Sequence, residues 1–144
     1  MFAVSVTLVW DILIPYGALS LLRRIDRIEA MKTLIYHMCK QEEWETAQAD
    51  GAYGGSSQDQ ADGFIHFSTA EQIVESAAKH RTGQEGLLLL TVDAPALGEP
   101  LKWEESRGGA LFPHLYGDLP VSAAVKIDPL PLGPDGKHVF PDLS

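Results

Sequence analysis

Three histidines stand where an imidazole could take part in chemistry. His37 lies inside the apolar stretch "TLIYHMC" (33–39), His66 inside "FIHFS" (64–68), and His114 within "FPHLYG" (112–117). Histidine is the side chain that exchanges protons most readily near neutral pH, so these rings suit acid–base catalysis or polar ligand binding. A histidine in an apolar strand can equally be a core ring that hydrogen-bonds to the backbone. The residue types allow both interpretations.

Carboxylates and hydroxyls accompany these histidines. Glu104 and Glu105 follow Trp103 in a short alternating stretch, and because neighbouring side chains of a strand point to opposite faces, only one of them can share a cleft with the histidines. The glycine-rich segments 51–63 and 107–120 supply further polar side chains. The predicted catalytic residues are therefore His37, His66, Glu104 and Glu105. The predicted ligand-binding residues are Tyr53, Ser56, Ser57, His114 and Tyr116.

Other kinds of site are less well supported by the spacing. Three histidines and a glutamate could hold zinc or iron, but H-x-H and H-x-x-x-H spacings are absent, so a metal is not expected. No G-x-S-x-G nucleophile motif occurs. The stretch "GAYGGSS" could hold an anion with backbone N–H groups, although it lacks the lysine of a P-loop. Cys39, the single cysteine, is expected to be a small buried residue.

The elements that must position these residues follow from hydrophobic periodicity. Strands are predicted at 33–39, 64–68, 86–94, 101–106 and 121–128, the third buried on both faces because it is apolar throughout. Helices are predicted at 40–50, with Trp44 and Ala47 on its buried face, and from 68 to about 80, opened by a Ser68–Glu71 capping box. Segments 51–63 and 107–120 are expected to be loops. Irregular alternation of strands and helices favours an α+β fold over a doubly wound sheet.

Composition narrows the partners. The chain has 144 residues, so one domain is expected. Its net charge of −9 makes nucleic acid an unexpected partner. A single cysteine fits a reducing compartment, and we expect the protein to be cytoplasmic.

The first thirty residues differ from the rest. They are apolar for about 22 positions, interrupted by Asp11 and Pro15, and arginines follow. A secretory signal, a membrane anchor and an extra packed helix are three interpretations. The fourth, which we favour, is that residues 1–30 lie upstream of a true start at Met31 and that 31–144 form a single domain. No membrane association is expected unless residues 1–30 are a real anchor.

The order of motifs after Met31 resembles the bacterial family catalogued as domain of unknown function 952. These motifs are Y-H, W-x-x-A, G-x-Y-x-x-S-S, D-G-F-I-H-F-S, W-E and F-P-H-L-Y-G, running from about residue 32 to about 127. That family is grouped with the ADP-ribosyltransferase-like fold, so the resemblance implies a split, mostly antiparallel β-sheet with short helices that clasps an NAD-type nucleotide. It brings no established activity.

Enzymes of that fold commonly carry a His-Tyr-Glu set. The resemblance places His37 at the ribose-binding histidine, His66 at the nicotinamide-stacking tyrosine, and Glu104 or Glu105 at the glutamate that steadies an oxocarbenium-like transition state. Met38 and Cys39 depart from the Gly-Thr that usually follows the histidine. The RNA 2′-phosphotransferase branch, which uses histidine and arginine, is disfavoured because the predicted strands hold no suitable arginine.

Three functions therefore remain open from the sequence. The first is an enzyme, or a degenerate enzyme, that acts on an NAD- or ADP-ribose-type nucleotide by glycosyl-transfer chemistry. The second is a non-catalytic small-molecule binding module. The third is a histidine-based metal-dependent hydrolase.

Overall fold

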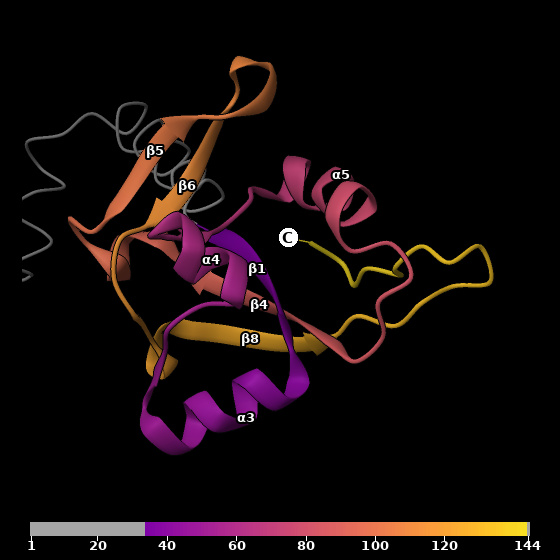
Figure 1. Ribbon diagram of the computed structural model, residues 1–144, viewed down its shortest axis with the longest axis horizontal. Coiled ribbons are helices and arrows are strands. Elements are labelled where there is room, and N and C mark those ends of the chain that lie inside the picture. Colours follow the sequence, from indigo (N-terminus) through magenta and orange to yellow (C-terminus); the bar gives the residue numbers. More distant parts are fainter. Residues whose placement is uncertain (1–33, 144) are drawn as a thin grey trace, which may run out of the picture. The chain divides into compact units, whose positions relative to one another are not determined.

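The computed structural model describes residues 34–143, which contain every predicted site residue (Figure 1). The predictions made for residues 1–30 lie outside the described residues. In chain order, the helices and strands are β1 (Leu34–Lys40), α3 (Gln41–Asp50), β2 (Ala52–Tyr53), α4 (Ser57–Asp62), β3 (Ile65–His66), α5 (Ala70–His80), β4 (Leu87–Asp93), β5 (Leu101–Glu105), β6 (Leu111–Leu115), β7 (Leu119–Pro120) and β8 (Ala124–Pro129).

The longest strands form the sheet β1-β4-β8, in which both pairings are antiparallel. The central strand, β4, is the apolar run "LLLLTVD", and Leu89, Leu90 and Val92 are fully buried. Consecutive residues of a strand point to opposite faces, so burial of Leu89 and Leu90 together shows that both faces of β4 are covered. The prediction of a doubly covered central strand is confirmed.

A second antiparallel sheet, β3-β6-β5, carries most of the polar residues of interest. Its strands β5 and β6 extend as an arm away from the first sheet (Figure 1). A two-stranded pairing of β2 with β7 completes the sheets. The fold is thus mixed, with antiparallel sheets and few short helices, as the α+β prediction requires.

The segment 65–68 joins the two larger sheets. On one side, β3 pairs with β6, and the Phe67 N–H donates to the Pro113 carbonyl (2.9 Å). On the other side, Ser68 forms an isolated bridge with Tyr36 of β1, through hydrogen bonds of 2.8 and 2.9 Å. His66 lies two residues before Ser68 and His37 one residue after Tyr36, so the link brings the first two histidines of the sequence together.

Some local predictions are wrong. Segment 51–63 is not a loop, because it contains β2 and α4. Segment 107–120 contains β6 and β7. Helix α5 is capped one residue later than expected, since the Thr69 N–H donates to the Gln72 side chain (3.0 Å) in place of the predicted Ser68–Glu71 box. Trp44 and Ala47 are buried on α3 as predicted. Within residues 34–143, no helix is long and apolar enough to cross a membrane.

Candidate functional site

A cleft of about 1060 Å³ is lined by residues of β1, α4, α5 and the β5–β6 arm. His37, His66 and His114 all line it. His66 and His114 are register partners in β3 and β6, and their ring centroids lie 5.7 Å apart. His37 reaches the same place from β1, because its Nδ1 lies 2.6 Å from the carbonyl oxygen of His66. Three histidines separated widely in sequence therefore belong to one constellation.

His37 is the buried member of this set, with 3% of its surface exposed. Burial lowers the pKa of His37, against the opposing effect of Asp59, so the ring is neutral near pH 7. A carbonyl can only accept, so Nδ1 carries the proton and donates to the His66 carbonyl. Nε2 then accepts from the hydroxyl of Tyr53 (2.9 Å). Tyr53 is itself buried and therefore fixes the tautomer of His37.

Asp59 organises the site, although its carboxylate is only 4% exposed. Its Oδ1 accepts from the ring Nδ1 of His66 (2.5 Å) and from the His66 backbone N–H (3.2 Å). Its Oδ2 accepts from the Ser56 N–H (2.8 Å) and lies 3.7 Å from His37 Nε2. Burial alone would raise the pKa of Asp59, but the hydrogen bonds from His66 and Ser56 and the proximity of His37 lower it to about 2.

Helix α4 exists because of the same carboxylate. Ser56 is its N-cap: the Ser56 hydroxyl accepts from the Asp59 N–H (3.2 Å) while Asp59 accepts from the Ser56 N–H in return. Gly55, with φ +96°, precedes the cap, and a Cβ on it would stand 2.7 Å from Asp59 Cβ. Only glycine tolerates both conditions, so Gly55 permits the close approach of the loop to Asp59.

His66 carries the opposite charge state. Its Nδ1 donates to Asp59, and its Nε2 lies 3.0 Å from Oδ2 of Asp62, one turn further along α4. The hydrogen bond to Asp59 raises the pKa of His66 against the opposing effect of burial, and Asp62 adds to the rise. With both nitrogens facing carboxylates, His66 is an imidazolium ion whose side chain remains 41% exposed.

His114 belongs to a second histidine–carboxylate pair. Its Nδ1 lies 2.7 Å from Glu104 Oε1, which also accepts from the Tyr116 hydroxyl (2.8 Å). The hydrogen bonds from His114 and Tyr116 lower the pKa of Glu104, and the bond to Glu104 raises that of Tyr116. The Phe64 ring stacks on His114 (4.1 Å between centroids, 29° between planes), so the imidazole is held in plane and in rotation.

The remaining predicted residues fall into two groups. Ser56 and Ser57 line the cleft, Ser56 as the buried cap and Ser57 as an exposed side chain. Tyr53, Glu104, Glu105 and Tyr116 are not among the lining residues. Glu105 is exposed and, as the neighbour of Glu104 on β5, points to the other face. Of the two glutamates, Glu104 is thus the one associated with a histidine.

Four residues of the site are absent from the sequence prediction: Asp59, Asp62, Phe64 and Arg81. Asp59 could have been found, because Ser56-x-x-Asp59 is a capping-box spacing, but no apolar helical run follows to support it. Arg81 closes α5, lines the cleft, and bonds to the neutral amide of Gln84 (3.2 Å). Lys79, another lining cation, is instead paired with Glu75 (3.0 Å). Arg81, unlike Lys79, therefore has a neutral side-chain partner.

Two other chemistries can be compared with the geometry. Within residues 34–143, no three His, Cys, Asp or Glu side chains are placed to hold a metal ion. Cys39 is buried in β1, as predicted, and burial raises its pKa to about 12. At neutral pH the group is a thiol, which is a poor nucleophile.

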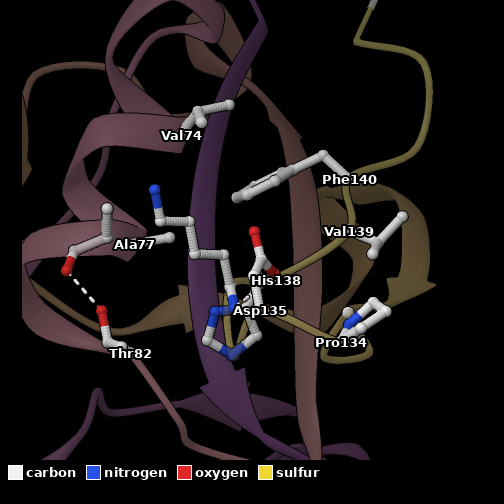
Figure 2. Close-up of a pocket in the computed structure, with 11 residues that line it drawn as sticks. Val74, Ala77, Thr82, Pro134, Asp135, His138, Val139 and Phe140 are labelled. Carbon is white, nitrogen blue, oxygen red and sulfur yellow. Dashed lines mark hydrogen bonds between the residues drawn. The ribbon is translucent and has the colours of Figure 1, made fainter.

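A second hollow of about 570 Å³ lies between α5 and the C-terminal segment (Figure 2). Val74 and Ala77 of α5 face Val139 and Phe140 across it (Figure 2). Its histidine, His138, is engaged through Nε2 with the Gln84 carbonyl (2.8 Å). We call it the apolar groove.

Comparisons with known proteins agree on one group of relatives. The profile of the family described as "Protein of unknown function (DUF952)" matches residues 38–127. The chain is similar to protein CC0527 from Caulobacter crescentus, whose crystal structure shows 52% identity and a TM-score of 0.73, covering 74% of this chain and 94% of that chain. The solution NMR structure of CC0527 shows 53% identity and a TM-score of 0.66, covering 73% and 90%. No curated protein matches the sequence.

Proposed function

Because the chain belongs to the family of proteins of unknown function DUF952, whose description states no activity, we propose its function from the geometry of its cleft: the protein binds a nucleotide of the NAD or ADP-ribose type. The observation that carries the proposal is the convergence of His37, His66 and His114, from three strands, in one cleft that also holds Arg81. Imidazoles and a cation are the groups that bind ribose hydroxyls and phosphates.

The size of the cleft and one of its cations support this class of ligand. Its volume of about 1060 Å³ is at the upper end of the range for small-molecule pockets, which is roughly 300–1000 Å³. Arg81 supplies a positive charge that its Gln84 partner does not neutralise, and a diphosphate would pair with it. The exposed hydroxyl of Ser57 is available to sugar oxygens, and the rings of His66 and His114 line the same cleft. In this assignment Tyr53, Asp59, Glu104 and Tyr116 position the histidines rather than contact the ligand.

The same proposal assigns the fold to the ADP-ribosyltransferase-like type. Support comes from Tyr36-His37 on the first described strand, from a short strand carrying His66 that leads directly into capped helix α5, and from two sheets linked by segment 65–68. A structure with ADP-ribose bound outside the cleft would contradict both the ligand and the fold assignment.

Binding is tested by thermal shift and calorimetry with ADP-ribose, NAD and AMP. We expect saturable stabilisation, about 2.7 kcal/mol when the ligand is at 100 times its Kd. His66→Ala should abolish the shift, and His138→Asn, in the apolar groove, should leave it unchanged. No stabilisation by any of the three nucleotides at millimolar concentration would refute the proposal.

One observation favours a second candidate, a non-catalytic nucleotide-binding module. Both nitrogens of His66 are engaged by carboxylates, Asp59 and Asp62, so neither is free for chemistry in this state. Recovery of every bound nucleotide unchanged after long incubation would support the module. Conversion of any one of them would exclude it.

A further inference from the structure

Two histidine–carboxylate pairs stand side by side at the cleft. His66 is held by Asp59, and His114 by Glu104, through Nδ1 in both cases. The two rings approach edge to face with centroids 5.7 Å apart. Phe64 contacts both rings, at 4.1 Å from His114 and 4.6 Å from His66. Such mutual support fixes both imidazoles before any ligand arrives, which is the condition for efficient acid–base catalysis.

The two pairs differ in the partners of their ring nitrogens. His66 faces carboxylates with both nitrogens and holds two protons, one of which, on Nε2, points to Asp62. Asp62 is 37% exposed and can turn to solvent when a ligand enters. His114 donates through Nδ1 to Glu104, so Nε2 is the ring nitrogen that would act as a base. His66 is then the candidate proton donor and His114 the candidate acceptor.

The charges around the pair indicate which reaction they suit. A glycosyl transfer develops positive charge on the sugar, and an imidazolium at the reacting atoms would oppose it. Displacement at phosphorus instead develops negative charge on oxygen, which His66 would stabilise. Moreover, nicotinamide leaves as a neutral group and needs no acid, whereas an alkoxide leaving group needs one.

We propose, resting on the nucleotide-binding function above, that His66 and His114 form a general acid–base pair that cleaves a ribose phosphodiester in a small ribonucleotide. A hydroxyl group, of water or of the ribose, attacks phosphorus and gives its proton to His114 Nε2. The bond from phosphorus to the leaving ribose oxygen breaks, and that oxygen receives the Nε2 proton of His66. Proton exchange with solvent restores both rings, and no redox partner or metal is required for the balance.

The surroundings favour a short substrate over a polymer. The chain carries a net charge of −9, so a long polyanion would be repelled. Phe112 lines the cleft beyond His114 and is half-buried, which suits it to stack on a base. A small ribonucleotide meets both constraints if its phosphodiester is either a strained ring or next to a ribose 2′-hydroxyl.

The test uses two probes with the full-length protein. In 2′,3′-cyclic AMP the nucleophile is water, and in the dinucleotide ApA it is the ribose 2′-hydroxyl. Product formation is followed by chromatography and ³¹P NMR across about pH 5 to 9. We expect turnover of at least one probe with a bell-shaped pH profile, because one ring must be protonated and the other unprotonated.

Variants separate the two roles. His66→Asn and His114→Gln should each lower kcat by at least about 100-fold. Glu104→Gln tests positioning: it should lower kcat and leave KM for the probe nearly unchanged, since Glu104 orients His114 through Nδ1 without touching the substrate. A structural role for Glu104 would lower thermal stability without this separation of kcat from KM. His138→Asn serves as the control histidine, and circular dichroism shows that each variant is folded.

The outcomes distinguish this inference from the proposal it rests on. If ADP-ribose binds but neither probe is converted at any pH, acid–base cleavage is wrong and nucleotide binding stands. If a probe is converted with wild-type kcat in His66→Asn or His114→Gln, the pair is not the catalyst. Turnover lost in both variants and kept in His138→Asn supports it.

Discussion

Helix α5 lines two hollows that use its residues differently. Toward the cleft it presents Gln72, Ser76 and Lys79, and toward the apolar groove Val74 and Ala77. In the cleft, the buried carboxylate of Asp59 holds His66, the His66 carbonyl accepts from His37, and Glu104 holds His114. In the apolar groove, apolar side chains make up most of the lining (Figure 2).

The two hollows differ in the free energy needed to bury the groups that line them. A buried carboxylate such as Asp59 is unfavourable unless several hydrogen-bond donors satisfy it. Here the helix cap, a backbone N–H and an imidazolium all donate to this one side chain. The apolar groove has a mostly apolar lining, which is consistent with a role in packing. The proposed nucleotide-binding function rests on this polar organisation of the cleft side.

Of the substitutions considered, Asp59→Asn should lower the free energy of unfolding most. The amide cannot accept all the hydrogen bonds of the carboxylate, and we expect a loss of about 2 kcal/mol in unfolding free energy at neutral pH. Urea denaturation measures it. Asp62→Asn, which removes a partly exposed carboxylate from the same ring, should cost less than about 1 kcal/mol; equal losses would show that Asp59 is not the organiser.

The pH dependence of that loss has a definite sign. Because the pKa of Asp59 is depressed, its carboxylate stabilises the folded state at pH values above 3.8, the ordinary pKa of the group. This contribution disappears as the pH falls toward about 2. The raised pKa of His66 stabilises the folded state at low pH, and this contribution is lost as the pH rises through its folded value. The gap between wild type and Asp59→Asn should therefore narrow at both ends of the range.

Gly55→Ala should come next. Its φ of +96° costs an alanine roughly 1 kcal/mol, and the new Cβ would press on Asp59 at 2.7 Å. Gly51→Ala is the matched control, since its φ is +90° and nothing lies within 4 Å of the new atom. Thermal unfolding should show the larger loss for Gly55→Ala; the same loss in both would mean that contact with Asp59 is unimportant.

Tyr53→Phe should cost about 1 kcal/mol, because it removes the donor to the buried Nε2 of His37. That hydrogen bond favours the neutral ring, so the pKa of His37 should rise in the variant. Histidine titration by heteronuclear NMR measures it. Tyr116→Phe, at an exposed tyrosine, should change stability by less than about 0.5 kcal/mol and leave the His37 titration unaltered.

Val74→Ser should have the smallest effect. Val74 is 51% exposed in the apolar groove, so a change within about 0.5 kcal/mol is expected, with ADP-ribose affinity unaltered by calorimetry. A weakened affinity would mean that the two hollows are coupled through α5 and that the comparison between them fails.

The long elements could be predicted because their signals are local. The strand around His37, the apolar run of β4 and the stripe of α5 each follow one periodicity over many residues. Strand β6 could not be predicted because it contains Pro113, whose nitrogen donates no hydrogen bond. Proline is tolerated at this position because only its carbonyl is used, as the acceptor for the Phe67 N–H. Helix α4 has six residues, too few for a periodic pattern.

The site could be predicted only in part for the same reason. The types of His37, His66 and His114 and their strand settings pointed to a shared place. Asp59 could not be placed, because its role depends on contacts with residues of three different elements. The choice between Glu104 and Glu105 likewise needed the register of β5 against β6, which aligns Lys102 with His114 and leaves Glu104 two positions along, on the same face.

Helix α4 has a consequence for how the region can be engineered. A helix of six residues is far below the length that is stable alone, about 12 residues or more, so α4 persists only while Asp59 is held by His66 of β3. Loop grafts or insertions within 54–62 would therefore remove the charge state of His66 along with the helix. Hydrogen exchange should detect this as a single opening event, in which the amides of α4 and of His66 lose protection at the same rate.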